Sequence, residues 1–205
     1  MIAFTMTLAF SQDTTKHKKE KMIKESQAVP GATTNKSGVV ETSMGTFEIE
    51  LYGSDAPKTV ENFVKLAQKK YFDGMRVHRV AKNFVIQTGD EKSKDAAKMS
   101  EWGTGGQSIW GKPFEDELNA ETPSYKAGYD KGVLAMANSG PNTNSSQFFV
   151  CLQKVGLPHN YTIFGKVTKG MDVVEKIGNV EIVPVMGGTD GRPKKDVFIK
   201  KIKIK

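Results

Sequence analysis

The sequence predicts a mainly β protein, built as a closed eight-stranded antiparallel β-barrel capped by two α-helices. Three observations lead to this fold class. About eight short segments have the apolar patterns of strands, and only two segments, far apart in the chain, have helical spacing. A sheet of short strands removes its exposed edges by closing on itself. The chain has 205 residues, of which 38% are hydrophobic, so it can bury the core of one domain and carry a tail in addition.

Residues 1–37 are predicted to lie outside the folded domain. The first ten are apolar enough for the core of a signal peptide, and Ala9-Phe10-Ser11 resembles a cleavage site, although no basic segment precedes them. A truncated signal peptide and an apolar tail without a targeting role both fit. The first is slightly favoured, so an exported or cell-envelope protein is expected rather than a cytoplasmic one. Residues 11–37 are rich in Lys, Thr and Ser and are expected to form a flexible tether.

The folded domain, residues 38–205, is expected to begin with a β-hairpin. Apolar residues alternate with polar ones on both sides of a turn at Met44-Gly45. This alternation directs Phe47, Ile49 and Leu51 toward the core.

A helix over residues 57–69 follows the hairpin. Asp55 is a suitable cap, and Pro57 suits the first turn of a helix. Apolar residues then recur at helical spacing, at Val60, Phe63, Val64 and Ala67.

The remaining elements are short strands, one loop and a second helix. Strands are expected near residues 75–80, 83–90, 132–137, 147–152, 162–167 and 196–204. Residues 90–107 form a long, polar, Gly-rich insertion that belongs on the surface. The second helix fits residues 171–177, closed by Gly178.

The charge pattern gives little support for a nucleic-acid-binding role. The chain has 30 Lys and Arg against 23 Asp and Glu, for a net charge of +7, but the excess lies in the N-terminal tail and at the C-terminal end. Charge at chain ends usually serves solvation or loose steering. No motif for binding DNA or RNA accompanies it, so no specific nucleic-acid partner is expected.

The cysteine and histidine content predicts neither a disulfide nor a metal site. Cys151, the single cysteine, lies in an apolar run and is expected to be a buried, inert thiol. His17, His78 and His159 are widely spaced, and no second cysteine accompanies them. No metal is therefore expected.

The segment over residues 134–150, LAMANSGPNTNSSQFFV, predicts a binding pocket. Two apolar runs flank a polar loop that is too long for a tight hairpin. Polar residues at the margins of the runs can line a pocket with an apolar floor. The margin residues are Asn138, Ser146 and Gln147, and the candidate floor residues are Met136, Phe148 and Phe149.

The segment over residues 77–90, VHRVAKNFVIQTGD, places polar side chains in apolar strands. If residues 77–80 form a strand, Arg79 shares a face with Val77, and His78 points the other way. Gln87 interrupts the next apolar strand and needs a hydrogen-bond partner if it is buried. Taken alone, Arg79 would be a solvated surface arginine and Gln87 an ordinary edge-strand amide.

Together these segments resemble the cyclophilins, a family of peptidyl-prolyl cis/trans isomerases. The fragments VHRV, NFVIQTGD, GTGGQSIWG, FEDE, LAMANSGPNTNSSQFFV and YTIFGKV occur in the family's order and approximate spacing, and the resemblance covers about residues 38–205. It implies an eight-stranded antiparallel barrel with two helices. It also implies an outer groove that binds proline-containing peptides without a cofactor.

The resemblance also implies roles for individual residues. Arg79 looks like the catalytic arginine, Gln87 like the glutamine that positions it and the peptide, and Phe84 like the third member of this set. Further substrate-binding positions, in the proline pocket and along the peptide groove, correspond to Val85, Met136, Ala137, Asn138, Gln147, Phe149, Leu157 and Tyr161. Phe148 is expected in the core, and His78 is expected to make a structural hydrogen bond.

The chain departs from the family pattern at three places, one of them a pair of neighbouring residues. Val85 stands where many members have methionine, and Tyr161 stands where a histidine is usual. In the preceding loop, Gly156 and Leu157 occupy the place where a tryptophan is usual. Proline turnover should tolerate these changes, but binding of cyclosporin-type inhibitors is put in doubt because the indole is missing.

The predicted function is therefore isomerisation of X-Pro bonds in client proteins, which assists protein folding. Rotation about the bond requires no covalent step, and a guanidinium such as that of Arg79 can stabilise the twisted amide. The alternative is a proline-peptide-binding chaperone or scaffold with incidental catalysis. An intact Arg79 favours the enzyme, because a pure binding module would not need it. A monomer is expected.

Overall fold

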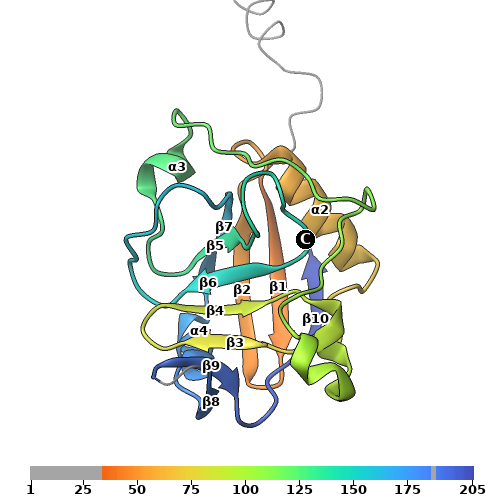
Figure 1. The fold of residues 1–205 in the computed structure, drawn as a ribbon. Helices are drawn as coiled ribbons and strands as arrows, with labels where there is room; N and C mark the ends of the chain where they lie inside the picture. The colour runs from red at the N-terminus through yellow and green to blue at the C-terminus, as the bar shows by residue number, and fades with distance from the viewer. Residues whose placement is uncertain (1–33, 186–187) are drawn as a thin grey trace, which may run out of the picture. The chain divides into compact units, whose positions relative to one another are not determined.

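The computed structural model describes residues 34–185 and 188–205. The predicted signal peptide and most of the tether lie outside the described residues. Figure 1 shows the arrangement of the described elements. The strands are β1 Lys36–Thr42, β2 Gly45–Leu51, β3 Arg79–Ala81, β4 Val85–Thr88, β5 Val133–Met136, β6 Phe148–Cys151, β7 Ile163–Lys169, β8 Ile182–Pro184, β9 Asp190–Pro193 and β10 Ile199–Ile204. The helices are α2 Pro57–Gln68, α3 Pro123–Ala127 and α4 Met171–Gly178, with two short 3₁₀ helices, η1 Glu91–Lys94 and η2 Ala96–Glu101.

All ten strands belong to one antiparallel sheet, in the order β10-β1-β2-β7-β5-β6-β4-β3-β9-β8. The mainly β class is therefore confirmed, whereas the closed eight-stranded barrel is not confirmed, because the sheet of the described residues has ten strands and its order ends at β10 and β8. The two additional strands, β8 and β9, form a hairpin rich in Pro and Gly that lacks the apolar alternation used to recognise strands. Among the described residues, no ladder joins β8 to β10, the two ends of the order.

Backbone hydrogen bonds also join residues 74–77, just before β3, to residues 197–199 at the beginning of β10. We call this contact the seam. Gly74 N donates to Ile199 O, Ile199 N donates to Met75 O, and Val77 N donates to Val197 O, each at 2.8 Å. These bonds satisfy backbone groups that neither segment pairs within its own named strand. The seam therefore ties the arginine-bearing strand to the C-terminal end of the domain.

The predicted hairpin is confirmed as β1 and β2. Phe47, Ile49 and Leu51 are buried, and the residues between them are half-buried. Thr42 closes the turn: its Oγ1 donates to Gly45 O at 2.7 Å and accepts from Met44 N at 3.1 Å. Gly45 has a φ of 137°, which a residue with a side chain rarely adopts.

Both predicted helices are present, and a third was missed. Helix α2 packs against β10, and α4 packs against β2, β3 and β4; in Figure 1 they lie at the upper right and the lower left. Helix α4 ends one residue later than predicted and is followed by Asn179. The five residues of α3 are too few to show helical periodicity.

The predicted cap of α2 is wrong. Asp55 makes no cap bond to this helix; instead its Oδ2 accepts from Ser124 N, in the first turn of α3, at 2.9 Å. Backbone N–H groups in the first turn of α2 have no partner within the helix. Two of them donate to the carboxylate of Glu117, Lys58 N at 3.0 Å and Thr59 N at 2.8 Å. A carboxylate also suits the positive end of a helix dipole.

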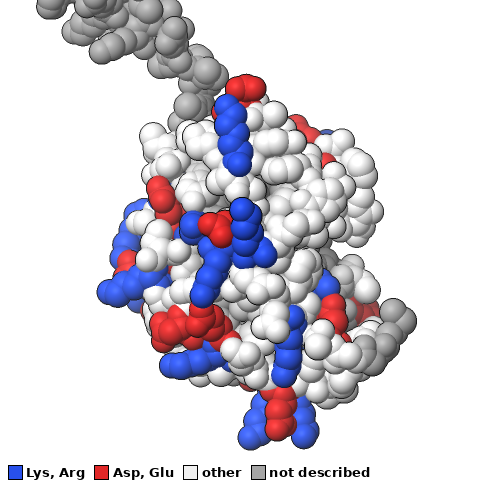
Figure 2. Space-filling model, turned by 90° about the vertical axis from the view of Figure 1, so that its left-hand side faces the viewer, with Lys and Arg blue, Asp and Glu red and all other residues white. Residues whose placement is uncertain are grey.

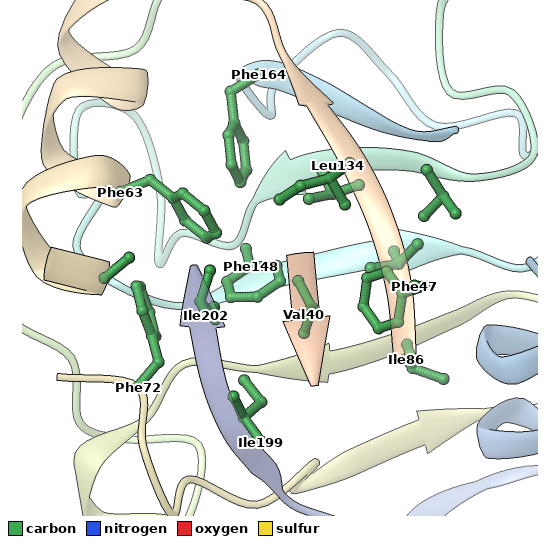
Figure 3. Packing of buried hydrophobic residues seen from close by; sticks show 14 of the residues in the cluster. Val40, Phe47, Phe63, Phe72, Ile86, Leu134, Phe148, Phe164, Ile199 and Ile202 are labelled. Carbon is green, nitrogen blue, oxygen red and sulfur yellow. The ribbon is translucent and has the colours of Figure 1, made fainter. Parts of the chain in front are cut away.

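Aromatic side chains fill the main core (Figure 3). The Phe63 ring lies 5.5 Å from that of Phe148 and 5.3 Å from that of Phe164, measured between centroids. As predicted, Phe148 belongs to this core. A smaller apolar cluster, built around Val85, Ala135 and Phe149, lies on the other face of the strands. The outer cluster supports the candidate site described below.

The surface carries mixed charge, as the face shown in Figure 2 illustrates. At the basic C-terminal end, Lys203 lies 3.0 Å from Glu41, and Lys205 lies 3.2 Å from Glu48. Much of the local positive charge is therefore offset by carboxylates. Within the described part of the chain, no helix has the length and apolar character needed to span a bilayer.

Candidate active site

Arg79 and Gln87 face each other across the β3–β4 pair. They are direct partners in the antiparallel register, and Nη1 of Arg79 donates to Oε1 of Gln87 at 3.1 Å. The expectation that Arg79 shares a face with Val77 is wrong. Strand β3 begins only at Arg79, and Val77 packs in the main core together with Val80, so the alternation breaks at His78.

Gln87 is held in turn by Gln147 and the glycine-rich loop. Nε2 of Gln87 donates to Oε1 of Gln147 at 2.9 Å. Nε2 of Gln147 donates to the carbonyl oxygens of Gly103 at 2.9 Å and Gly105 at 2.6 Å. The partner that the sequence required for Gln87 is therefore present, and a chain of amides connects the end of the insertion to Arg79.

A cavity of about 140 Å³ opens beside this pair. Its floor and walls combine one cation, three side chains able to hydrogen-bond and several apolar groups. The lining residues are Arg79, Phe84, Val85, Gln87, Ala137, Asn138, Phe149, Leu157 and Tyr161. Nine of the eleven residues that the resemblance singled out thus surround one cavity.

Two of the eleven residues lie elsewhere. Met136 is 2% exposed and packs in the main core, so its predicted place in the proline pocket is corrected. It ends β5 one residue before Ala137, and successive strand residues point to opposite faces. Gln147 is buried behind Gln87 and contacts it rather than the cavity.

The walls of the cavity are fixed by their own contacts. The ring of Phe149 packs edge-on against Tyr161, with centroids 5.6 Å apart. The hydroxyl of Tyr129 donates to Tyr161 O at 2.9 Å and accepts from Tyr161 N at 3.1 Å. Asn138 is tied to the same loop, since its Nδ2 donates to Asn160 O at 2.8 Å. Tyr161, which the sequence left open between groove wall and strand packing, is a groove wall.

His78 lies beside Arg79 without a hydrogen bond to either ring nitrogen from the described residues. The structural hydrogen bond predicted for it is therefore absent from the described structure. Burial lowers the pKa of His78 to about 4, more than the nearby Asp90 carboxylate raises it. The imidazole is neutral near pH 7.

Cys151 is buried and free, as the sequence predicts. Burial raises the pKa of its thiol to about 12, so it is not a nucleophile at neutral pH. Among residues 34–185 and 188–205, no three His, Cys, Asp or Glu side chains gather in a way that could hold a metal ion.

Asp190 is a site residue that the sequence did not indicate. It lies on β9, and its carboxylate contacts the Arg79 guanidinium, with Nη2 of Arg79 2.6 Å from Oδ2. The two residues are 111 positions apart in the chain, so no local pattern could link them. A second cavity of about 500 Å³ lies on this side of Arg79, where His78, Trp102 and Asp190 contribute to its lining. A third, of about 330 Å³, lies around Tyr52 and Ser124 and shares no residue with the predicted site.

The family model described as "Cyclophilin type peptidyl-prolyl cis-trans isomerase/CLD" matches residues 38–204. The chain belongs to this family. The cyclophilin match spans every element from β2 to β10, and the three strands that line the cavity, β3, β4 and β6, lie inside it.

Curated cyclophilins support the assignment. The chain is 47% identical to the peptidyl-prolyl cis-trans isomerase-like 1 of Aspergillus oryzae over 142 residues, which cover 69% of this chain and 81% of the relative. It is 43% identical to the mouse protein of the same name over 176 residues, covering 85% and 96%. It is 41% identical over 191 residues to mouse peptidylprolyl isomerase domain and WD repeat-containing protein 1. That match covers 93% of this chain but only 27% of the longer relative.

Solved cyclophilin structures share the fold. The crystal structure of a Cryptosporidium parvum cyclophilin-type isomerase matches with a TM-score of 0.71 and 32% identity, over 83% of this chain and 98% of that one. A structure of the same isomerase in the presence of the dipeptide Ala-Pro matches with a TM-score of 0.70. The chain is thus an isomerase of the cyclophilin type by sequence and by fold.

Proposed function

We propose that the 140 Å³ cavity holds the proline of a client segment and that Arg79 catalyses rotation about the X-Pro bond. One observation carries the proposal. The Arg79 guanidinium borders a pocket with several apolar wall residues, is held by other side chains and remains 39% exposed. A fixed cation beside an apolar ring site is what a non-covalent isomerase needs.

The reaction requires only that the amide lose its resonance. The barrier to rotation is about 18–20 kcal/mol and comes from the partial double bond. A hydrogen bond from Arg79 to the prolyl nitrogen, or to a nearby carbonyl oxygen, favours the twisted state over both planar states. Arginine suits this role because it stays charged and presents a planar set of donors.

The cavity walls restrain the proline ring while the preceding carbonyl rotates. Phe84, Phe149 and Leu157 supply apolar surface, and Asn138 supplies an amide at the edge where the peptide backbone would pass. Gln87 restrains Arg79 on one side. The substrate class proposed is a flexible proline-containing segment, supported by the related Cryptosporidium structure in the presence of the dipeptide Ala-Pro.

A binding module that merely holds proline peptides is the second candidate. It would use the same apolar walls but would gain little from a restrained arginine. The hydrogen bonds that orient Arg79 therefore favour the enzyme. We further propose that the protein is a monomer. We also propose that it has no specific nucleic-acid partner, which the ion pairs that offset the basic C-terminal residues support.

The experiment that tests the proposal compares Arg79→Ala with the matched variant Arg76→Ala. Arg76 is a neighbouring arginine that pairs with Asp196 and does not line the cavity. Arg79→Ala should lower kcat/KM for an X-Pro peptide by about a hundredfold or more while the protein stays folded. Arg76→Ala should keep the wild-type rate. Wild-type turnover by folded Arg79→Ala would refute the catalytic role.

A further inference from the structure

We propose that Asp190 is a positioning residue of the isomerase site, whose carboxylate holds the Arg79 guanidinium in the orientation that meets the substrate. The inference rests on the catalytic role proposed above for Arg79. Nε of Arg79 lies 3.0 Å from each carboxylate oxygen of Asp190, and Nη2 lies 2.6 Å from Oδ2. Such two-nitrogen contacts between arginine and a carboxylate fix direction as well as distance.

The carboxylate is itself carried by a well-restrained backbone. Asp190 begins β9 and is the register partner of Ala81, while Gly191 is the partner of Val80. A Cβ placed on Gly191 would lie 2.2 Å from Val183 O, so the close approach of β8 to β9 requires glycine at this position. Strand pairing on both sides therefore sets where Asp190 can place its side chain.

Arg79 keeps N–H donors for a substrate after it has bound Asp190 and Gln87. A guanidinium has five N–H groups. Asp190 engages the Nε–H and one on Nη2, and Gln87 engages one on Nη1. One N–H on each terminal nitrogen is left. Arg79 lines the proline cavity and Asp190 does not, so Asp190 would act only through the arginine.

The main effect of the pair falls on catalysis rather than on folding. Both side chains are partly exposed, at 39% and 43%, and ion pairs of this kind contribute little to stability. A free arginine side chain samples many rotamers. Holding it in one rotamer in the transition state costs that conformational entropy. Two anchors, Gln87 and Asp190, remove most of that freedom before the substrate binds.

The test measures kcat and KM separately for Asp190→Asn and Asp190→Ala, by NMR exchange on an X-Pro peptide. Asparagine keeps the shape and one acceptor, and alanine removes both. We expect kcat to fall about threefold for Asp190→Asn and about tenfold for Asp190→Ala, with KM within about twofold of wild type. The Arg79 Nε–H should also exchange with water faster in Asp190→Ala.

Two controls separate positioning from a general structural effect. Asp196→Asn makes the same change in a similar contact, where Oδ2 lies 2.6 Å from Nε of Arg76 outside the cavity, and should leave kcat unchanged. In an Arg79→Lys background, Asp190→Ala should alter kcat by less than about twofold, because residues that act as a unit are not additive.

Several results would overturn the inference. An unchanged or raised kcat in Asp190→Ala would show that the carboxylate does not assist Arg79. An equal loss in the Arg79→Lys background would show a structural effect independent of the arginine. If Arg79→Ala itself keeps full activity, the proposed function fails and the positioning role fails with it. If Arg79→Ala is inactive and Asp190→Ala is fully active, the positioning role is refuted and the proposed function stands.

Discussion

The side-chain amide of Gln87 donates to that of Gln147 at 2.9 Å, which turns its own oxygen toward Arg79. The orientation of one amide thus depends on the next. Gln147 is fixed by the carbonyl oxygens of Gly103 and Gly105, so the loop that ends the insertion contributes to the geometry of the site.

Gln147→Leu should weaken both activity and stability. The substitution leaves the Gln87 amide and two loop carbonyls without their partner, and an unsatisfied buried polar group costs about 1–3 kcal/mol. We expect kcat/KM to fall several-fold and the free energy of unfolding to fall by about 1 kcal/mol, the lower end of that range, because Gln87 is only half-buried and Gly103 is exposed. Peptide turnover and urea unfolding provide the measurements. Gln153→Leu, at an exposed position, is the control. Equal activity and equal stability of the two variants would contradict the prediction.

His78 should make the protein less stable in mild acid. Its pKa is about 4 in the folded protein against an ordinary value of 6.5, so the unfolded chain binds the extra proton between these values. The free energy of unfolding should therefore fall as the pH is lowered from 6.5 toward 4, with His78 contributing up to about 3 kcal/mol. Urea unfolding of wild type and His78→Asn across this range measures the contribution. The free energy of unfolding of His78→Asn should depend less steeply on pH than that of the wild type. Identical pH dependences of the two proteins would contradict the prediction.

Cys151 should resist thiol reagents in the folded protein. The thiol is buried, and its pKa of about 12 leaves almost no thiolate at pH 8. Labelling with a chromogenic disulfide should be slow without denaturant and should reach one thiol per chain in urea, since the sequence contains a single cysteine. Rapid labelling of the native protein would be inconsistent with this burial. Cys151→Ser supplies the blank.

Gly156→Trp should strengthen cyclosporin binding. The resemblance to the cyclophilins indicates that an indole is missing near this loop, and a Cβ added at Gly156 meets no atom within 4 Å. The position is exposed, so the larger side chain fits without displacing the core. We expect about a tenfold gain in affinity, equivalent to about 1.4 kcal/mol, with turnover within about twofold of wild type. Titration calorimetry would measure the gain.

The neighbouring exposed Lys154→Trp is the control for that substitution. An equal gain in both variants would indicate nonspecific stacking of indole on the inhibitor. No gain in Gly156→Trp would show that the missing indole does not limit the affinity.

Local patterns in the sequence are enough to predict the hairpin, α2 and α4, whereas most residues around the 140 Å³ cavity were indicated by the resemblance to the cyclophilins. They succeed where a period or a motif is contained within a few neighbouring residues, as with Phe47, Ile49 and Leu51 on β2. The resemblance then adds roles that periodicity alone could not assign, such as that of Arg79.

Contacts between distant segments explain what the sequence missed. Glu117 satisfies the first turn of α2 from 58 positions away, and nothing in the local composition marks it. The break in alternation at His78 follows directly after Val77, whose N–H donates to the carbonyl oxygen of Val197, far along the chain. The place of Met136 could not be predicted because a pattern of alternating residues shows two faces but not which face borders a groove.

The seam between residues 74–77 and 197–199 bears on how the protein is made. Arg79 is synthesised more than a hundred residues before Asp190, its partner at a separation of 111, and before the strand that holds the chain ahead of it. At about 5–20 residues per second, that interval lasts roughly 5 to 20 s on the ribosome. A nascent chain therefore carries its arginine for seconds before the anchor from β9 exists. The groove reaches its final form only when the C-terminal strands have emerged.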